Sequence, residues 1–344
     1  MWSGRSAIAL AFRLVLIALA SLMSVVPTSA QTLERIRERG LLICGATGIL
    51  PAFSQNIDGR WSGFDVDLCR ALAAAIFGDP NLVEFRPLNG DSRFVQLQTG
   101  AIDIVIRNAP WTIRRDTTFD AQYVTTTFFD GQAFLVPESL GLVSAYELDN
   151  VTVCVIDGGE EQQRMRDFFF EIQASYEEVP YEDLEDLGAA YRAGLCNAVT
   201  GSGRWLYAIR RALDEPAIHR ILPERISKEL LGPVVADGDE NWFDIVRWTI
   251  FGLIDAEELG VTSLNIEQMK AARNPSIQRL LGLQTDFGTP LGLTPTFMAD
   301  AIRLVGNYAE IYDRNFGPQT GAALLRGLNS LWGNGGLLYA PPIR

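Results

Sequence analysis

Histidine and cysteine are the residue types that most often carry nucleophilic or metal chemistry, and this chain of 344 residues has few of them. A Ser-His-Asp or Cys-His arrangement, or a histidine-rich metal site, would have to use its one histidine, His219. That residue follows Asp214-Glu215-Pro216, a sequence typical of a helix end or a loop, which predicts a surface histidine. The types of residue present therefore disfavour catalysis by a side-chain nucleophile.

The four cysteines are Cys44, Cys69, Cys154 and Cys196, and none forms the Cys-x-x-Cys pair that is typical of zinc sites. In an oxidising compartment an even number of cysteines predicts disulfide bonds. Four cysteines allow three pairings, and their spacing alone does not choose among them.

Composition and charge exclude other classes of protein. The chain is 48% hydrophobic and 21% charged, which is ordinary for globular proteins, and its length suggests two domains. It has 29 Lys+Arg against 42 Asp+Glu, a net charge of −13, and its only lysines are Lys228 and Lys270. Such a chain repels phosphate backbones and has no polybasic patch, so nucleic-acid binding is not expected.

Residues 1–30 have the pattern of a secretory signal peptide. Arg5 and Arg13 accompany an apolar run, and Pro27-Thr28-Ser29-Ala30 supplies the small residues of a cleavage site. An uncleaved membrane anchor is the alternative, but the run is short for the ~20 residues of a span. We expect cleavage after Ala30, which removes two arginines, changes the net charge from −13 to −15 and leaves an exported, soluble protein.

Alternating strand and helix patterns predict an α/β fold in the first half of the mature chain. Residues 41–46 form the apolar run of a buried strand, and residues 64–77 form an alanine-rich helix. A strand near 83–85, a helix over 92–99 and a strand over 102–106 continue the alternation. When helices cover the faces of a parallel sheet, ligands bind at the carboxyl ends of its strands.

The same pattern restarts in the second half of the chain. A strand, a glycine turn, two helices and a short strand are predicted at 151–156, 157–159, 160–172, 187–193 and 197–199. Two similar units in tandem, without a long linker, suggest two lobes that face each other across a cleft. From residue 240 the chain is mainly helical, and residues 242–258 form an apolar-striped helix.

The segment Gly63-Phe64-Asp65-Val66-Asp67-Leu68 resembles the signature of family 3 solute-binding proteins, the extracytoplasmic receptors of polar amino-acid ABC transporters. Other segments resemble the subgroup of general L-amino-acid or glutamate/glutamine/aspartate/asparagine receptors. They include Trp111-Thr112-x-x-Arg115-Asp116, Tyr191-Arg192-Ala193-Gly194-Leu195-Cys196, Trp242-Phe243-Asp244-Ile245 and the tail Tyr339-Ala340-Pro341-Pro342-Ile343-Arg344. The resemblance covers the whole mature chain.

The resemblance implies an α/β fold shaped as a two-lobed periplasmic-binding-protein clamp, with two interlobe crossings and the C-terminal helices on lobe one. Lobe one would comprise 31–128 and 235–344, and lobe two 132–230, with a hinge near 128–136 and 228–235.

The same partition decides the disulfides. Because a bridge between the lobes would obstruct hinge closure, the resemblance implies one pair in each lobe. These pairs are Cys44 with Cys69 and Cys154 with Cys196.

In this family one arginine binds the ligand carboxylate, and Arg115 corresponds to it, with Asn108 and Thr112 beside it. A bidentate guanidinium suits a carboxylate, whereas a ligand ammonium needs an acidic partner. The alternative is that Arg115 lies on the surface beside Arg114. After Asn108, where relatives carry hydroxyl residues, this chain has Ala109-Pro110, and proline removes an N–H donor.

Lobe two departs from the family pattern twice more. The relatives' Gly-Thr-Thr, at a helix N-terminus that holds the ligand carboxylate, corresponds to Gly158-Gly159-Glu160-Glu161. The relatives' aspartate, which pairs with the ligand ammonium, corresponds to Ser202. A one-residue shift of the alignment supplies no acid, because none lies between Asn197 and Asp214.

These departures predict a changed specificity at a site that includes Gly158, Gly159, Glu160 and Ser202. Glu160, together with Asp157, would supply the negative charge that Ser202 lacks, and glutamate and aspartate would then bind poorly. Ordinary amino-acid binding stays open if Glu160 takes the ammonium. The opposite case is that Glu160 faces solvent and only stabilises the helix dipole.

The expected function is that of a periplasmic receptor for an ABC importer, with an amino acid or amino-acid-like polar ligand. The partners would be that small ligand and a membrane permease, no cofactor or metal is implied, and the protein is expected to be a monomer. One alternative is a dehydratase-like enzyme on the same fold, which the absence of a histidine from the predicted cleft disfavours. Another is a ligand sensor for a signalling receptor, which the sequence does not separate from transport.

Overall fold

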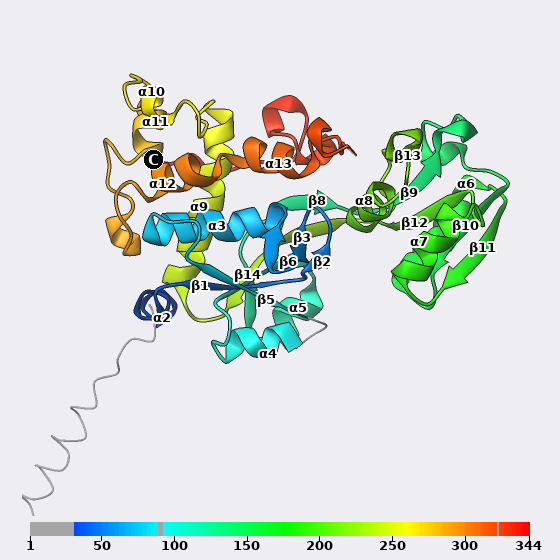
Figure 1. Ribbon diagram of the computed structural model, residues 1–344, viewed down its shortest axis with the longest axis horizontal. Helices are drawn as coiled ribbons and strands as arrows, with labels where there is room; N and C mark the ends of the chain where they lie inside the picture. Colours follow the sequence, from blue (N-terminus) through cyan, green and yellow to red (C-terminus); the bar gives the residue numbers. More distant parts are fainter. Residues whose placement is uncertain (1–30, 89–91, 322) are drawn as a thin grey trace, which may run out of the picture.

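The computed structural model describes residues 31–88, 92–321 and 323–344, and the predicted signal peptide at 1–30 lies outside them. It confirms the expected fold class. Two α/β lobes are joined by strands that cross between them, and the C-terminal helices pack on the first lobe (Figure 1).

The sheet of the first lobe has the strand order β5-β1-β6-β14-β7, and β8 also pairs with β14. Its strands are β1 (Leu42–Ala46), β5 (Val83–Pro87), β6 (Ile104–Pro110), β7 (Ala121–Tyr123), β8 (Phe128–Asp130) and β14 (Glu229–Ala236). Strands β1, β5 and β6 are parallel, as the alternating pattern predicts, whereas β14 runs antiparallel to β6. Beside this sheet lies a small antiparallel one, made of β2 (Ile49–Leu50), β3 (Ser54–Ile57) and β4 (Arg60–Ser62).

Helices surround the first sheet. They are α2 (Gln31–Arg39), α3 (Phe64–Phe77), α4 (Ser92–Gln98), α5 (Ile113–Thr118), α9 (Glu240–Glu258), α10 (Ile266–Met269), α11 (Pro275–Leu280), α12 (Phe297–Val305) and α13 (Tyr308–Phe316). Helix α3 is buried along most of its length because it packs against the sheet and against the C-terminal helices α9, α12 and α13. Its alanines allow this close packing on more than one side.

The signature segment that begins α3 has a structural role in this lobe. Gly63 has a φ of 127°, and a Cβ atom there would lie 2.3 Å from the carbonyl oxygen of Phe53, so only glycine fits. Asp67 is buried and accepts hydrogen bonds from Arg314 (3.0 Å) and Asn315 (2.9 Å) of α13. The segment therefore fixes the C-terminal helices on the first lobe.

The second lobe has the strand order β11-β10-β12-β9-β13. Its elements are β9 (Gln132–Pro137), β10 (Val151–Ile156), α6 (Glu160–Ile172), β11 (Tyr176–Tyr181), α7 (Leu184–Arg192), β12 (Ala198–Ser202), α8 (Gly203–Arg211) and β13 (His219–Ile221). Strand β10 is parallel to β11 and β12, and a separate apolar core packs on each face of this sheet.

The chain passes between the two sheets at two adjacent points. Gly131 alone separates β8 of the first sheet from β9 of the second, and residues 222–228 lead back to β14. A Cβ atom on Gly131 would lie 2.3 Å from the carbonyl oxygen of Ser227, so the two passages touch through their backbones. Gln132 also donates its N–H to the Ser227 hydroxyl at 2.9 Å.

The cysteines lie at disulfide distance in the two expected pairs. The Cα atoms of Cys44 and Cys69 are 6.4 Å apart, and those of Cys154 and Cys196 are 5.8 Å apart. Both distances fall in the range of disulfide bonds. Each pair joins elements of a single lobe, so neither restrains the movement of one lobe against the other.

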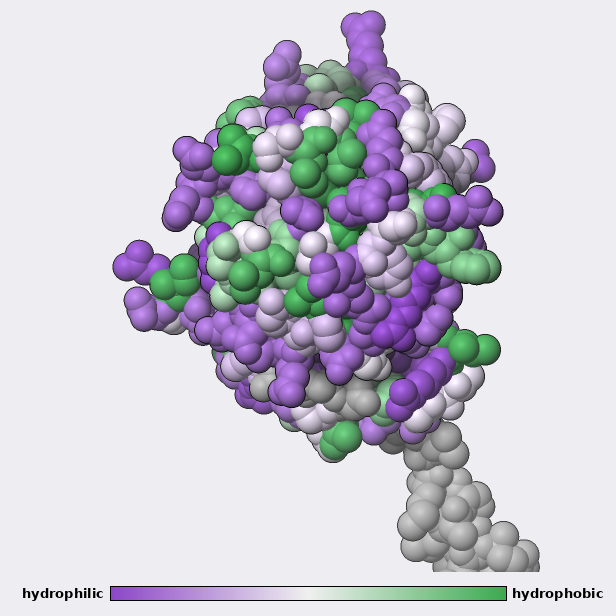
Figure 2. All heavy atoms as spheres, turned by 90° about the vertical axis from the view of Figure 1, so that its right-hand side faces the viewer, coloured by the Kyte–Doolittle hydropathy of each residue, from purple (hydrophilic) through white to green (hydrophobic). Residues whose placement is uncertain are grey.

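The outer end of the second lobe is mixed in hydropathy. Figure 2 shows apolar side chains there in groups that hydrophilic side chains separate. Within the described residues, the helices are too short or too polar to cross a membrane.

Candidate functional site

The residues predicted to bind a ligand come from both lobes. In lobe two they lie where β10 and β12 end and where α6 begins, which is the edge at which α/β sheets bind ligands. In lobe one they lie from the end of β6 to α5. Asn108 belongs to β6, but its side chain is outside the described part of the structure.

Arg115 is held by the segment that precedes it. Thr112 is the N-cap of α5, and its side chain accepts a hydrogen bond from the Arg115 N–H. The half-buried guanidinium of Arg115 donates to the carbonyl oxygen of Pro110 at the end of β6. Asp116 accepts a hydrogen bond from the Trp111 indole at 2.5 Å. The Thr112-to-Asp116 motif thus forms one turn that orients the arginine.

Arg107 is a second guanidinium near this turn that the sequence reasoning did not select. Its Nε donates to the Leu88 carbonyl oxygen at 2.8 Å. Burial lowers the pKa of Arg107, and the positive charges of Arg115 and Arg204 lower it further, against the opposing charge of Asp65. Arg107 is therefore electrostatically coupled both to the predicted ligand arginine and to lobe two.

The glycine turn of lobe two is fixed by a side chain that the sequence reasoning also missed. Gly158 has a φ of 69°, and its N–H donates to the side-chain oxygen of Gln162 at 2.9 Å. The amide nitrogen of Gln162 donates to Asp157 (3.1 Å) and to Glu178. Gly159 is the N-cap of α6 and has no side-chain cap. The sequence signal for this role of Gln162 is its position three residues after the N-cap, where glutamine often accepts a hydrogen bond from the backbone.

Glu160 and Glu161 lie in different surroundings although they are consecutive. The side chain of Glu160 is 84% exposed and pairs with Arg164, one turn later on α6. The carboxylate of Glu161 instead faces β12, where it accepts hydrogen bonds from the N–H (3.0 Å) and hydroxyl (2.9 Å) of Ser202. The binding role of Glu160 stays a prediction, and the structure adds Glu161 as the acid beside Ser202.

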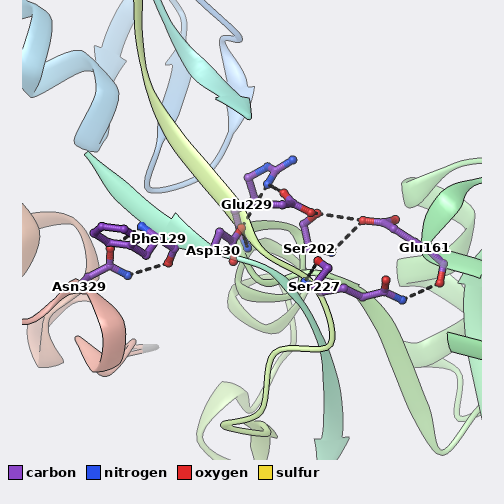
Figure 3. A network of polar contacts seen from close by, with 9 residues as sticks. Phe129, Asp130, Glu161, Ser202, Ser227, Glu229 and Asn329 are labelled. Atoms are coloured by element: carbon purple, nitrogen blue, oxygen red, sulfur yellow. Dashed lines mark hydrogen bonds and ion pairs between the residues drawn. The ribbon is translucent and has the colours of Figure 1, made fainter. Parts of the chain in front are cut away.

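Ser202 also connects this acid to the interlobe passages (Figure 3). Its hydroxyl lies 2.8 Å from a carboxylate oxygen of Glu229, the first residue of β14, and Arg204 pairs with both Glu229 and Asp130. We call these five residues, Asp130, Glu161, Ser202, Arg204 and Glu229, the hinge network. Burial by itself would lower the pKa of Arg204, but the two adjacent carboxylates raise it above its ordinary value.

Metal or histidine chemistry finds no support at this site. Among the described residues, no group of three or more His, Cys, Asp or Glu side chains is placed to hold a metal ion. His219 is half-buried in β13, where Nδ1 lies 2.7 Å from the Tyr191 hydroxyl, and burial lowers its pKa.

Two α/β lobes, joined by two passages and with polar side chains where their strands end, define a clamp for small solutes. Residues 42–264 match the family model of bacterial extracellular solute-binding proteins, family 3. The chain belongs to that family.

Its relatives are similar over nearly their whole length. The chain is 45% identical to the general L-amino acid-binding periplasmic protein AapJ of Rhizobium johnstonii, over 92% of this chain and 94% of that protein. It is 44% identical to the glutamate/glutamine/aspartate/asparagine-binding protein BztA of Rhodobacter capsulatus, with the same coverage of 92% and 94%. A solved ABC transporter periplasmic binding protein from Brucella ovis with glutathione bound is 44% identical, has a TM-score of 0.80 and is matched over 92% of this chain and 100% of that one.

Proposed function

We propose that this protein is a periplasmic receptor that binds an amino-acid-like solute and delivers it to the membrane permease of an ABC importer. The observation that carries the proposal is the similarity at 44–45% identity to two amino-acid receptors over 92% of this chain. The names of both relatives describe binding, which supports a receptor rather than a dehydratase-like enzyme.

The proposed ligand is a solute with an ammonium group and one or more carboxylates. Arg115 would bind a carboxylate, with Thr112 and Arg107 beside it, while lobe two supplies acidic side chains. Glutathione has two carboxylates and one ammonium, and it is bound to the similar protein from Brucella ovis. Glutamate and aspartate are expected to bind less tightly, because their second carboxylate would lie near Glu161.

Two rigid lobes that close on the ligand are part of the proposal. Lobe one would be 31–128 with 235–344, and lobe two 132–230, turning near 128–136 and 228–235. The separate sheets support this division, and Tyr207 of α8 is a lobe-two residue that packs in the core of lobe one. The backbone contact between Gly131 and Ser227 supports a hinge at the point where both passages meet.

The location of the protein and its partners are also part of the proposal, because they are inferred from the same family relation. The pattern of residues 1–30 supports a cleaved signal peptide and a location in the periplasm. There the acidic protein would act as a monomer and meet its permease partner in the ligand-bound form.

A ligand screen on the mature protein, residues 31–344, tests the proposal. We expect glutathione or one of the standard L-amino acids to raise the melting temperature, because a ligand at 100 times its Kd stabilises the fold by about 2.7 kcal/mol. Amines, opines and small dicarboxylates complete the panel. If no member of the panel raises the melting temperature, the protein is not an amino-acid-type receptor.

The enzyme alternative is tested with the ligand that the screen finds. A receptor returns that ligand chemically unchanged after long incubation, as mass spectrometry of the released solute would show. Conversion of the ligand, with a rate proportional to protein concentration, would instead support a dehydratase-like enzyme.

A further inference from the structure

The acid next to Ser202, Glu161, differs from its neighbour Glu160 in its ion pairing. Glu160 pairs with Arg164, but in the part of the chain that the structure describes no arginine or lysine forms an ion pair with Glu161. Arg204, the cation of the hinge network, is already shared by Asp130 and Glu229. The network thus contains three carboxylates and one guanidinium, which pairs with two of them.

The Ser202 hydroxyl cannot satisfy both acids that contact it. It lies 2.9 Å from an oxygen of Glu161 and 2.8 Å from an oxygen of Glu229, yet a hydroxyl has a single proton to donate. When that proton is directed to Glu229, the hydroxyl oxygen faces Glu161 only as an acceptor. The oxygens of Ser202 and Glu161 are then adjacent acceptors. A cationic donor that contacts both would stabilise this arrangement.

A buried acceptor next to Glu161 also has no donor. The Gln132 side chain is fully buried, and its amide nitrogen donates to the Glu161 carbonyl (2.7 Å) and to the Thr200 hydroxyl (3.1 Å). The oxygen of the same amide has no hydrogen-bond donor within the described residues. Buried acceptors without a donor are uncommon, so this oxygen can accept a hydrogen bond from a donor outside the described residues.

We propose that Glu161 is the residue that binds the ammonium group of the ligand, with the Ser202 hydroxyl as a second acceptor. This inference rests on the proposed function, since it assigns a specificity-determining residue within that binding site. An ammonium has three N–H donors and a positive charge, so it would complement the negative Glu161 carboxylate and the Ser202 oxygen. The first turn of α6, which lies beside the end of β12, would thus supply the negative charge that the family resemblance places at position 202.

The matched pair Glu161→Gln and Glu160→Gln tests the assignment. Both changes remove one negative charge from the same helix turn and keep the size of the side chain. Calorimetry would use glutathione and L-glutamine, each compared with its analogue lacking the amino group, glutaryl-cysteinylglycine and 4-carbamoylbutanoate. We expect Glu161→Gln to weaken the amino ligands at least about 30-fold, and Glu160→Gln to change them less than about 3-fold.

The analogues separate binding from folding. If Glu161 pairs with the ammonium, Glu161→Gln affects the analogues less than about 3-fold, whereas a damaged lobe would weaken the amino ligand and the analogue alike. Equal effects of the two glutamine variants on the amino ligands would overturn the assignment and leave the receptor function standing. Absence of binding by the wild-type protein to every ligand of the screen would overturn the proposed function, and this inference with it.

Discussion

The consecutive residues Glu160 and Glu161 show how much of a binding site residue types and spacing can predict. The sequence predicts negative charge at the start of the helix that follows Gly158-Gly159. Successive residues of a helix point in directions about 100° apart, so only one of the pair faces β12. That residue is Glu161, whereas Glu160 pairs along the helix with Arg164. Spacing alone could not choose, because the choice depends on the angle at which α6 packs on the sheet.

In lobe one, too, the sequence pattern identifies only part of the predicted site. The resemblance of the Trp111-to-Asp116 segment selects Arg115, and the structure shows the turn that orients it. Nothing in the local pattern selects Arg107, because its importance comes from charges on other elements that the fold brings near it. Side-chain environments of this kind arise only from tertiary structure.

Arg115→Ala is the residue-scale prediction for lobe one. Removing the guanidinium would leave a ligand carboxylate without its bidentate partner, and we expect glutathione or the ligand found in the screen to bind at least about 30-fold more weakly by calorimetry. Arg114→Ala is the matched control, since Arg114 is the exposed neighbour on the same short helix. Equal affinity of the Arg115→Ala and wild-type proteins would show that the carboxylate binds elsewhere.

At the scale of elements, the sequence predicts the parallel units better than the antiparallel ones. Expected elements at 64–77, 151–156 and 160–172 match α3, β10 and α6 residue for residue. Their periodicity and flanking glycines are local signals. Strands β9 and β14 were expected only as parts of the hinge, because they pair with partners that are distant in the sequence.

Helix α9 carries a buried acid that predicts a pH dependence of stability. Burial, reinforced by the charge of Glu258, raises the pKa of Asp255 to about 7, although a hydrogen bond from the Ile343 N–H opposes the rise. An unfolded chain releases this proton near pH 3.9. Between about pH 4 and pH 7 the folded state therefore holds a proton that the unfolded state has lost, and stability from this group falls as the pH rises.

Asp255→Asn removes this titration and keeps an acceptor for the Ile343 N–H. We expect the free energy of unfolding of the variant, minus that of the wild type, to be about 2 kcal/mol larger at pH 8 than at pH 4, as measured by urea unfolding. Asp244→Asn, on the partly exposed face of the same helix, is the control for the loss of a carboxylate from α9. A difference between variant and wild type that is the same at both pH values would contradict the raised pKa.

At the scale of the molecule, two lobes and two passages determine how a ligand acts. The lobes have separate sheets and both cysteine pairs lie within a lobe, while Tyr207 of α8 packs in the core of the first lobe. Strands β8 and β14 pair in the first lobe and continue toward the second through Gly131 and residues 222–228 (Figure 1). A ligand stabilises a closed arrangement only to the extent that it contacts both lobes.

The last prediction concerns that closure. A ligand that touches Arg115 on lobe one and Glu161 on lobe two binds the closed arrangement more tightly than the open one, so saturating glutathione should reduce the radius of gyration in small-angle X-ray scattering. In Glu161→Gln the ligand loses its contact with lobe two, and the reduction at saturation should be smaller. Glu160→Gln should close as the wild type does. If calorimetry shows saturation while the scattering curve stays unchanged, the ligand binds to one lobe alone and closure plays no part in its recognition.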